Sequence, residues 1–231
     1  MKRKLYEYWR KLAWNPGYLN PFIIAFWVVN RWRGVPFRQA ATFYVLLKFT
    51  AELEKSGIEV YLRHGTLLGA VRQSAFAGRP KDLDFFIKGE DLGVLLGIEK
   101  EMAKVGFKMR PVIKNQHKVN FYCKMGCGRI QVRPYQLVQD EASGKRHYVA
   151  QYLDRILQGD YTVDENLANK KKLTSSISAK RIEQPSWALI FGQLFRIPGE
   201  PEEILVDIYG SDWRVPNSKQ FSWRKENPQG Y

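Results

Sequence analysis

The sequence is poor in cysteine and histidine, which removes several common kinds of site. It contains 2 cysteines and 3 histidines in 231 residues. Three residues separate Cys123 from Cys127, and no histidine stands at ligand spacing, so the pair does not match a zinc site. We expect two free thiols in a reducing cytoplasm. The histidines have no ordered partners along the chain, so no Ser-His-Asp or Cys-His triad is indicated.

Long apolar runs, repeats and low-complexity segments are also absent. No stretch approaches the roughly 20 apolar residues that cross a bilayer. The basic start, residues 1–18, lacks the apolar region and cleavage site of a signal peptide, so we expect a cytoplasmic protein. Hydrophobic residues make up 45% and charged residues 26% of the chain, as in an average globular protein. We predict one domain over residues 41–216, with flanking segments at 1–40 and 217–231.

Acidic residues are outnumbered, and the formal net charge is +14. Such a charge favours polyanionic partners, which include phosphorylated substrates, nucleic acid and anionic lipid, but it does not choose among them. Residues 1–40 hold eight Lys/Arg, one acid and four tryptophans around the apolar run 22–29. Two interpretations stay open: an amphipathic segment on an anionic membrane surface, or a helix packed on the domain's own core.

Apolar periodicity and turn residues predict an α+β fold, with a mixed sheet flanked by helices. Gly57, Gly210 and Pro216 are expected to end helices or prevent their restart. Residues 139–147 are expected to form a loop, and residues 168–181 are polar and basic. The predicted helices are 41–57, 65–72, 90–107 and 201–210, and the predicted strands are 58–65, 83–87, 117–124 and 129–137.

Two aspartates interrupt the apolar strand in "DLDFFI". Alternate residues of a strand share a face, so the Asp82 and Asp84 side chains should lie side by side, with Cα atoms about 7 Å apart. Two such carboxylates repel unless a cation lies between them, and they suit Mg²⁺ or Mn²⁺ carrying a phosphate. The alternative is structural: Asp82 closes a turn begun at Pro80, and Asp84 pairs with Arg79 or Lys81.

The turn before the aspartates favours a phosphate site. Gly65 and Thr66 follow a predicted strand and begin a helix, where backbone N–H groups and a hydroxyl suit an anion. Arg72, on the same helix, can form a bidentate contact with a second phosphate. Lys118 opens a strand that should flank the site, where it either neutralises a phosphate or is an ordinary strand-end lysine. This order of elements is typical of a nucleotidyltransferase-like site.

Three stretches, "GTLLGAVRQSAF", "DLDFFI" and "YGSDWRVP", resemble the LicD family, which includes bacterial phosphorylcholine transferases and the animal fukutin-related proteins. The resemblance spans residues 43–216. It implies a nucleotidyltransferase-like fold and transfer of a phospho-alcohol from a CDP-activated donor to a glycan or glycolipid acceptor, at the inner face of the membrane. It also implies that Asp82 and Asp84 hold Mg²⁺ or Mn²⁺, that Gly65 and Thr66 bind donor phosphate, and that Arg72 supports it.

The chain departs from the family at two places. "AGRPK" precedes the aspartates where the family has an aromatic and further acids, and Gln131, in "IQVRP", stands where a third acid is usual. Glutamine can offer an oxygen to a metal or donor but cannot accept a proton as a general base, so His64, His117 or Glu141 would have to activate the acceptor.

Three further interpretations remain. Asp212 and Trp213 either position a base or sugar, or pack as the end of a helix. The chain is alternatively a nucleotidyltransferase acting on RNA or protein, although no aromatic-basic RNA motif is present and nucleic acid is not the expected partner. It is alternatively a catalytically impaired nucleotide-binding member.

Overall fold

A computed structural model describes residues 37–78, 82–112, 118–123, 129–139, 144–150 and 176–216. They form helices and a mixed sheet, which confirms the predicted α+β class. The elements are α3 (Phe37–Lys55), β1 (Tyr61–Leu62), α4 (His64–Gln73), β2 (Leu83–Lys88), the 3-10 turn η1 (Gly89–Asp91), α5 (Leu92–Gly97), α6 (Glu99–Lys104), β3 (Lys108–Val112), β4 (Lys118–Tyr122), β5 (Arg129–Gln139), β6 (Arg146–Ala150), β7 (Ser176–Ser178), α9 (Ala179–Glu183), β8 (Ser186–Ile190), β9 (Gln193–Ile197) and α10 (Pro201–Tyr209).

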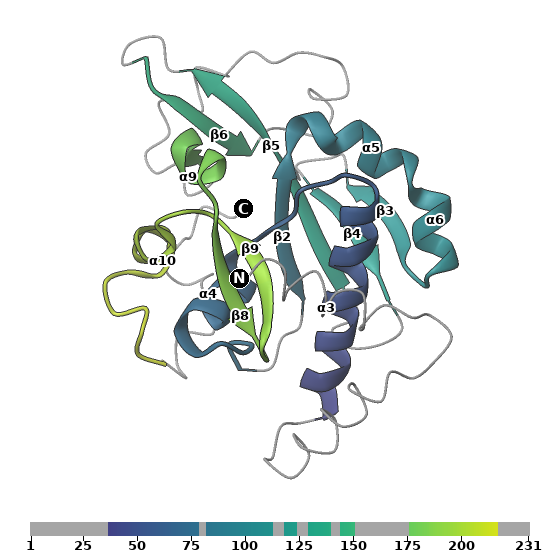
Figure 1. Ribbon diagram of the computed structural model, residues 1–231, viewed down its shortest axis with the longest axis horizontal. Coiled ribbons are helices and arrows are strands. Elements are labelled where there is room, and N and C mark those ends of the chain that lie inside the picture. Colours follow the sequence, from purple (N-terminus) through teal and green to yellow (C-terminus); the bar gives the residue numbers. More distant parts are fainter. Residues whose placement is uncertain are drawn as a thin grey trace, which may run out of the picture.

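The described part of the main sheet has seven strands (Figure 1). Five are ordered β1-β2-β5-β4-β3, while β6 pairs with β5 and β7 pairs with β6. The long strand β5 makes this layout possible, because its first half pairs with β2 and β4 while its second half pairs with β6. The β2–β5 pairing is parallel, and the other pairings are antiparallel. The parallel pair sets Asp84 directly beside Gln131.

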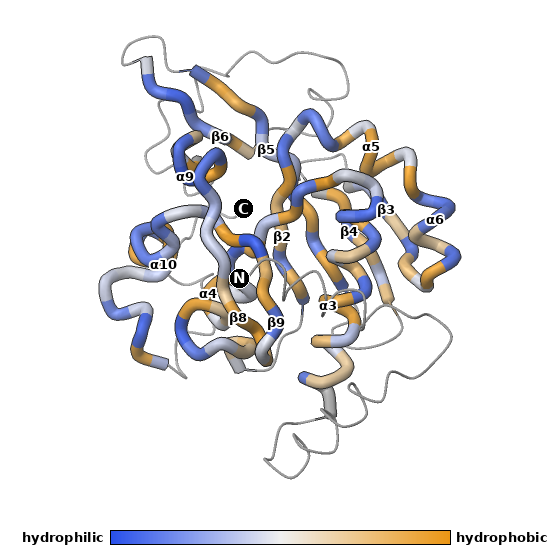
Figure 2. Tube along the Cα trace, in the orientation of Figure 1, coloured by the Kyte–Doolittle hydropathy of each residue, from blue (hydrophilic) through white to orange (hydrophobic). Residues whose placement is uncertain are grey.

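One face of the sheet carries the main core. Phe49 of α3 is fully buried, and its ring contacts the rings of Phe85, Phe107 and Phe121 at centroid distances of 5.0–5.4 Å. Figure 1 shows α3, α5 and α6 gathered on this side of the strands. In Figure 2 the orange, apolar stretches run along β2 and β4, whereas α6 is blue at the edge of the molecule. Phe85 of β2 faces this core, and because side chains alternate along a strand, Asp84 and Phe86 lie on the other face.

The opposite face is partly covered by the β8–β9 hairpin with α4, α9 and α10 (Figure 1). Tyr61 of β1 stacks on Phe86 and donates its hydroxyl hydrogen to the carbonyl of Ile182, which ties α9 to the sheet. Phe43 of α3 makes edge contacts with Phe191 and Phe195 of the hairpin region. The hairpin thus packs beside α4 and the start of α3.

Several predicted elements are confirmed. Helix α4, strand β2, the antiparallel β4–β5 pair and α10 lie where the sequence placed them, and α3 begins earlier than expected, at Phe37. Gly57 has φ +79° just after α3, as expected for a residue that ends a helix, and Pro201 begins α10. Among the described helices, none is both long and apolar enough to cross a membrane.

Other predictions were wrong at their edges. The strand expected over 58–65 shrinks to two residues, because pairing with β2 ends where α4 begins at His64. The expected loop 139–147 contains the start of β6, which pairs with the second half of β5. The segment 168–181 reaches into β7 and α9, and the β8–β9 hairpin was not predicted. Residues 1–36 and 217–231, including the apolar run 22–29, lie outside the described residues.

Candidate active site

A row of polar residues crosses the second face of the sheet, the one that carries Asp84 and Phe86. The backbone N–H of Arg63 donates to the carbonyl of Asp84 at 2.9 Å, Asp84 stands beside Gln131, and Gln131 stands beside Asn120. Arg63, Asn120 and Gln131 are buried, with exposed fractions of 5%, 5% and 7%. Four polar side chains in a row on a sheet are unusual for a packed core face, since each needs a partner when it is removed from water.

Asp82 is held by two donors from β5. Arg129 Nη2 lies 2.6 Å and Gln131 Nε2 lies 2.8 Å from the same oxygen, Asp82 Oδ2. Gln131, which the sequence resemblance set where a third acid is usual, thus presents an N–H to Asp82 and carries no charge of its own. Asp82 keeps its other oxygen, Oδ1, without a hydrogen bond from the described residues.

Asp84 is the electrostatically strained member of the pair. Burial, followed by the charge of Asp82, raises the pKa of Asp84 from 3.8 to about 6, although Arg63, Arg133 and Arg129 oppose the shift. Its backbone N–H donates to Thr66 Oγ1 at 3.0 Å, but no described side chain forms a hydrogen bond or ion pair with its carboxylate. A cation between the two carboxylates would relieve both the burial cost and the repulsion.

The start of α4 lies against this pair. Thr66 is buried, and its hydroxyl accepts the Asp84 N–H, so its position links the helix to β2. Gly65 has open space where a side chain would begin, since a Cβ there meets no atom within 4 Å. His64 takes φ +43°, a region that non-glycine residues rarely adopt. Burial, then the charges of Arg63 and Arg133, lower the pKa of His64, which keeps the imidazole neutral.

Arg133, Arg72 and the end of α10 lie around Arg63, which is the first residue of the row. The Arg63 guanidinium lies over the Tyr135 ring, 5.2 Å from its centroid. Burial, then the charge of Arg63, lower the pKa of Arg133 to about 10. Tyr209 ends α10, which packs against α4. Burial, then the charge of Asp84, raise the pKa of Tyr209, whereas the charges of Arg63 and Arg72 oppose the shift. Arg72 itself reaches Gln73 at 3.3 Å.

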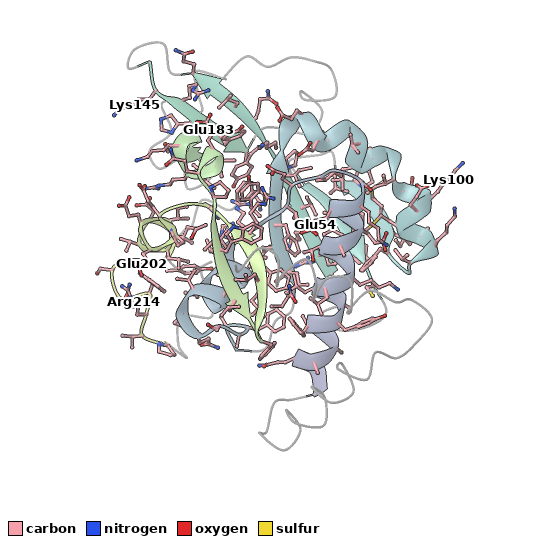
Figure 3. All side chains as sticks on the ribbon, in the orientation of Figure 1. Glu54, Lys100, Lys145, Glu183, Glu202 and Arg214 are labelled. Carbon is pink, nitrogen blue, oxygen red and sulfur yellow. The ribbon has the colours of Figure 1, made fainter. Side chains whose placement is uncertain are left out.

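The segment after α10 packs as a structural cap. Trp213 is buried, 4% exposed, and the Arg214 guanidinium lies 4.4 Å from the centroid of its ring. Arg214 also pairs with Glu202 at 2.5 Å, and Figure 3 shows these two labelled side chains at the rim of the molecule. Asp212 is exposed. The geometry agrees with the packing interpretation of Trp213.

The residues fit one divalent cation better than two. Within the described ranges, no group of three His, Cys, Asp or Glu side chains could hold an ion. Asp82 Oδ1 and the Asp84 carboxylate supply hard oxygen ligands, and Mg²⁺ commonly binds through one or two carboxylates and keeps several waters. A second ion would need a further acid, whereas the neighbouring side chain on β5 is that of Gln131, whose Nε2 donates to Asp82. Asp82 and Asp84 are therefore the candidate ligands.

The structure brings together most of the predicted site residues that it describes. Asp82, Asp84, Gly65, Thr66 and Gln131 lie at the junction of β2, β5 and α4. Their roles toward a substrate stay predictions. Outside the described residues lie His117, Glu141, the alternative partners Arg79 and Lys81, and the side chain of Lys118, whose backbone opens β4.

Sequence reasoning missed four members of the site: Arg63, Asn120, Arg129 and Tyr209. Asn120 is buried, and its Oδ1 has no hydrogen-bond partner among the described residues. A polar residue at an alternate position of a buried strand was the available signal, since it must share the face of Asp84. Arg133 was noticed beside Gln131 but was given no role.

We found no protein-family model that matches the chain and no matching curated protein. Among solved structures, it is similar to a solution structure of the antibiotic-resistance factor ANT(2'')-Ia, with TM-score 0.41 and 15% identity over 74% of this chain and 71% of that one. It is also similar to the lincomycin-bound lincosamide antibiotic adenylyltransferase LnuA, with TM-score 0.42 and 12% identity over 78% of this chain and 89% of that one.

A third similar structure is ANT(2")-Ia in complex with adenylyl-2"-tobramycin, with TM-score 0.39 and 15% identity over 80% of this chain and 82% of that one. At TM-scores below 0.5 these likenesses assign neither a family nor a substrate to this chain. Its function has to be inferred from its own residues.

Proposed function

We propose that the chain is a nucleotidyltransferase-like, divalent-cation-dependent transferase that moves a phospho-alcohol, such as phosphocholine, ribitol phosphate or glycerol phosphate, from a CDP-activated donor to a glycan or glycolipid. The observation that carries this proposal is the hydrogen bond from the Asp84 N–H to Thr66 Oγ1, 3.0 Å long. It joins the start of a helix, which suits phosphate, to a carboxylate pair, which suits a cation. The LicD resemblance supplies the donor class and an acceptor at the inner membrane face.

Each residue has a role in this proposal. Asp82 and Asp84 would hold one Mg²⁺ or Mn²⁺, which when bound neutralises phosphate charge and orients the transferred group. Gly65 leaves room for a donor phosphate to approach the backbone at the start of α4. His64 is neutral and can accept a proton from the acceptor hydroxyl, a role that Gln131 cannot fill.

One observation favours a second candidate, a nucleotide-binding protein with weakened chemistry. Gln131 and Arg129 both donate to Asp82 Oδ2 and so compete with a metal ion for that aspartate. In this case a CDP compound would bind, but turnover would be absent in the wild-type chain. Binding and turnover must therefore be measured separately.

The test is binding and turnover of CDP-choline, CDP-ribitol and CDP-glycerol with Mg²⁺ or Mn²⁺. We expect Asp84→Asn to lose turnover, and we expect Asp207→Asn, which removes an exposed carboxylate on α10, to retain it. Binding with no turnover in the wild type selects the second candidate. If none of the three compounds binds in the presence of either metal, both candidates are wrong.

A further inference from the structure

Arg63 is a buried cation that forms no ion pair within 4 Å among the described residues. Its side chain is 5% exposed, and its Nη1 has no hydrogen-bond partner among the described residues. The guanidinium is positioned by its contact with the Tyr135 ring and by the backbone bond to Asp84. A buried guanidinium N–H with no acceptor costs free energy, so such groups are normally satisfied by an acceptor or a ligand.

Arg133 adds a second guanidinium to the same place. It lies on β5 beside Phe86 of β2, and on the same face as Gln131 two residues earlier. Burial and the charge of Arg63 lower its pKa to about 10, so the two cations repel each other. The described residues provide no ion pair within 4 Å for either arginine. Asp84 is the carboxylate whose charge both arginines feel, so two positive charges face one negative charge.

The beginning of α4 adds partial positive charge beside these arginines. Arg63 is the residue at the N-terminal cap of this ten-residue helix, and no side chain caps it. At Gly65 the space beside the first turn is open. Unsatisfied N–H groups at a helix start attract anions, and an adjacent guanidinium adds charge-assisted hydrogen bonds in a planar fork. The missing partner is therefore an anion, and an oxyanion suits the planar N–H groups of the guanidiniums.

We propose that Arg63, Arg133 and the N-terminus of α4 form a binding site for a phosphate or diphosphate group, and that this site works without a metal ion. Assignment of that group to the diphosphate of a CDP-type donor rests on the proposed function. The anion site itself rests on the two arginines and the start of α4, and does not depend on that assignment.

The test is calorimetric titration of the full chain with inorganic pyrophosphate in EDTA. We expect the wild type to bind pyrophosphate and Arg133→Gln to bind it roughly 10- to 100-fold more weakly, as the loss of a charge-assisted contact predicts. The unliganded thermal midpoint of Arg133→Gln should be no lower than that of the wild type, because one of two repelling charges is removed. Arg133→Lys keeps the charge without the fork and should fall between them.

Arg146→Gln is the matched control. It removes one positive charge from β6, where Arg146 forms an exposed ion pair with Glu183 of α9. It should bind pyrophosphate like the wild type. The proposal is wrong if the wild type does not bind pyrophosphate without metal, or if Arg146→Gln weakens binding as much as Arg133→Gln.

Two outcomes separate this site from the proposed function. If pyrophosphate binding depends on Arg133 but no CDP compound binds, the anion site stands and the proposed function fails. If CDP compounds are turned over but Arg133→Gln binds pyrophosphate normally, the anion site fails and the proposed function stands. Displacement of pyrophosphate by CDP supports the donor assignment, and displacement by glycerol phosphate but not by CDP overturns it.

Discussion

Replacing Asp84 with asparagine should make the unliganded protein more stable while it removes activity. Burial of the Asp84 carboxylate and the nearby charge of Asp82 together raise its pKa to about 6. Asparagine keeps the size of the side chain and the backbone bond to Thr66 but carries no charge. The prediction thus separates a residue kept for function from one kept for stability.

The magnitude follows from proton linkage. A carboxyl whose pKa is 3.8 when unfolded and about 6 when folded holds its proton more tightly in the native state. Its ionisation therefore costs nothing below pH 3.8, and the cost grows as the pH rises through 4 to 6. At about 1.4 kcal/mol per pH unit the full cost is about 3 kcal/mol, and solvent screening of a half-buried group reduces it to about 1–3 kcal/mol.

The measurement is urea unfolding of both proteins at pH 8 and at pH 4, without metal. Asp84→Asn should exceed the wild type by about 1–3 kcal/mol at pH 8, and the difference should shrink toward zero at pH 4. Added Mg²⁺ should stabilise the wild type and leave the variant unchanged, as linkage requires for an ion that binds only the native carboxylate pair.

Asp82→Asn is the control, because the Asp82 carboxylate has two donors among the described residues, whereas the Asp84 carboxylate has none there. It loses a partly exposed ion pair with Arg129, which is worth about 0–1 kcal/mol, and it should not gain stability at pH 8 to the same extent. An Asp84→Asn protein that is no more stable than the wild type at pH 8 would refute the electrostatic account of the pair.

Three further variants test the site and the fold. Gly65→Ala should keep or slightly raise stability, since its Cβ meets open space, yet weaken binding of CDP compounds in titration, whereas Gly69→Ala, whose Cβ would lie 2.4 Å from the carbonyl oxygen of Ala75, should lower the unfolding midpoint. Gln131→Asp should lose about 1 kcal/mol or more without metal but bind Mn²⁺ more tightly in calorimetry, because a third carboxylate joins the pair. Phe49→Ala should cost about 3–5 kcal/mol in denaturant unfolding, since its ring is fully buried among three others.

The local elements of the site could be predicted because their causes are local. Alternation along the predicted strand placed Asp82 and Asp84 on one face, and the Gly65-Thr66 turn predicted the start of α4. The family resemblance marked Gln131 as a site residue, and its place beside Asp84 comes from the β2–β5 register of the structure. The prediction of the aspartates and of the Gly65-Thr66 turn did not require the order of the strands in the sheet.

The rest of the site depends on contacts between distant segments. Arg63 directly follows β1 and Arg133 lies in β5, so their approach requires the β1-β2-β5 strand order, which no spacing reveals. Tyr209 ends α10, and the packing of α10 against α4 is a contact that sequence spacing does not show. The β8–β9 hairpin was missed because its turn, Phe191-Gly192, has positive φ at both residues, and phenylalanine is rarely found in that conformation.

The uncharged side chain of Gln131 also affects the charge of the whole site. Three guanidiniums, those of Arg63, Arg129 and Arg133, influence the pKa of Asp84. With aspartate at position 131, three carboxylates would oppose them, whereas with glutamine the arginines exceed the carboxylates by one. On the proposed function, the surplus positive charge and one divalent ion together face the phosphates, so the arginines supply charge that a second ion would otherwise bring. Glutamine at position 131 cannot serve as an acidic metal ligand, and it therefore leaves one arginine charge available for the substrate.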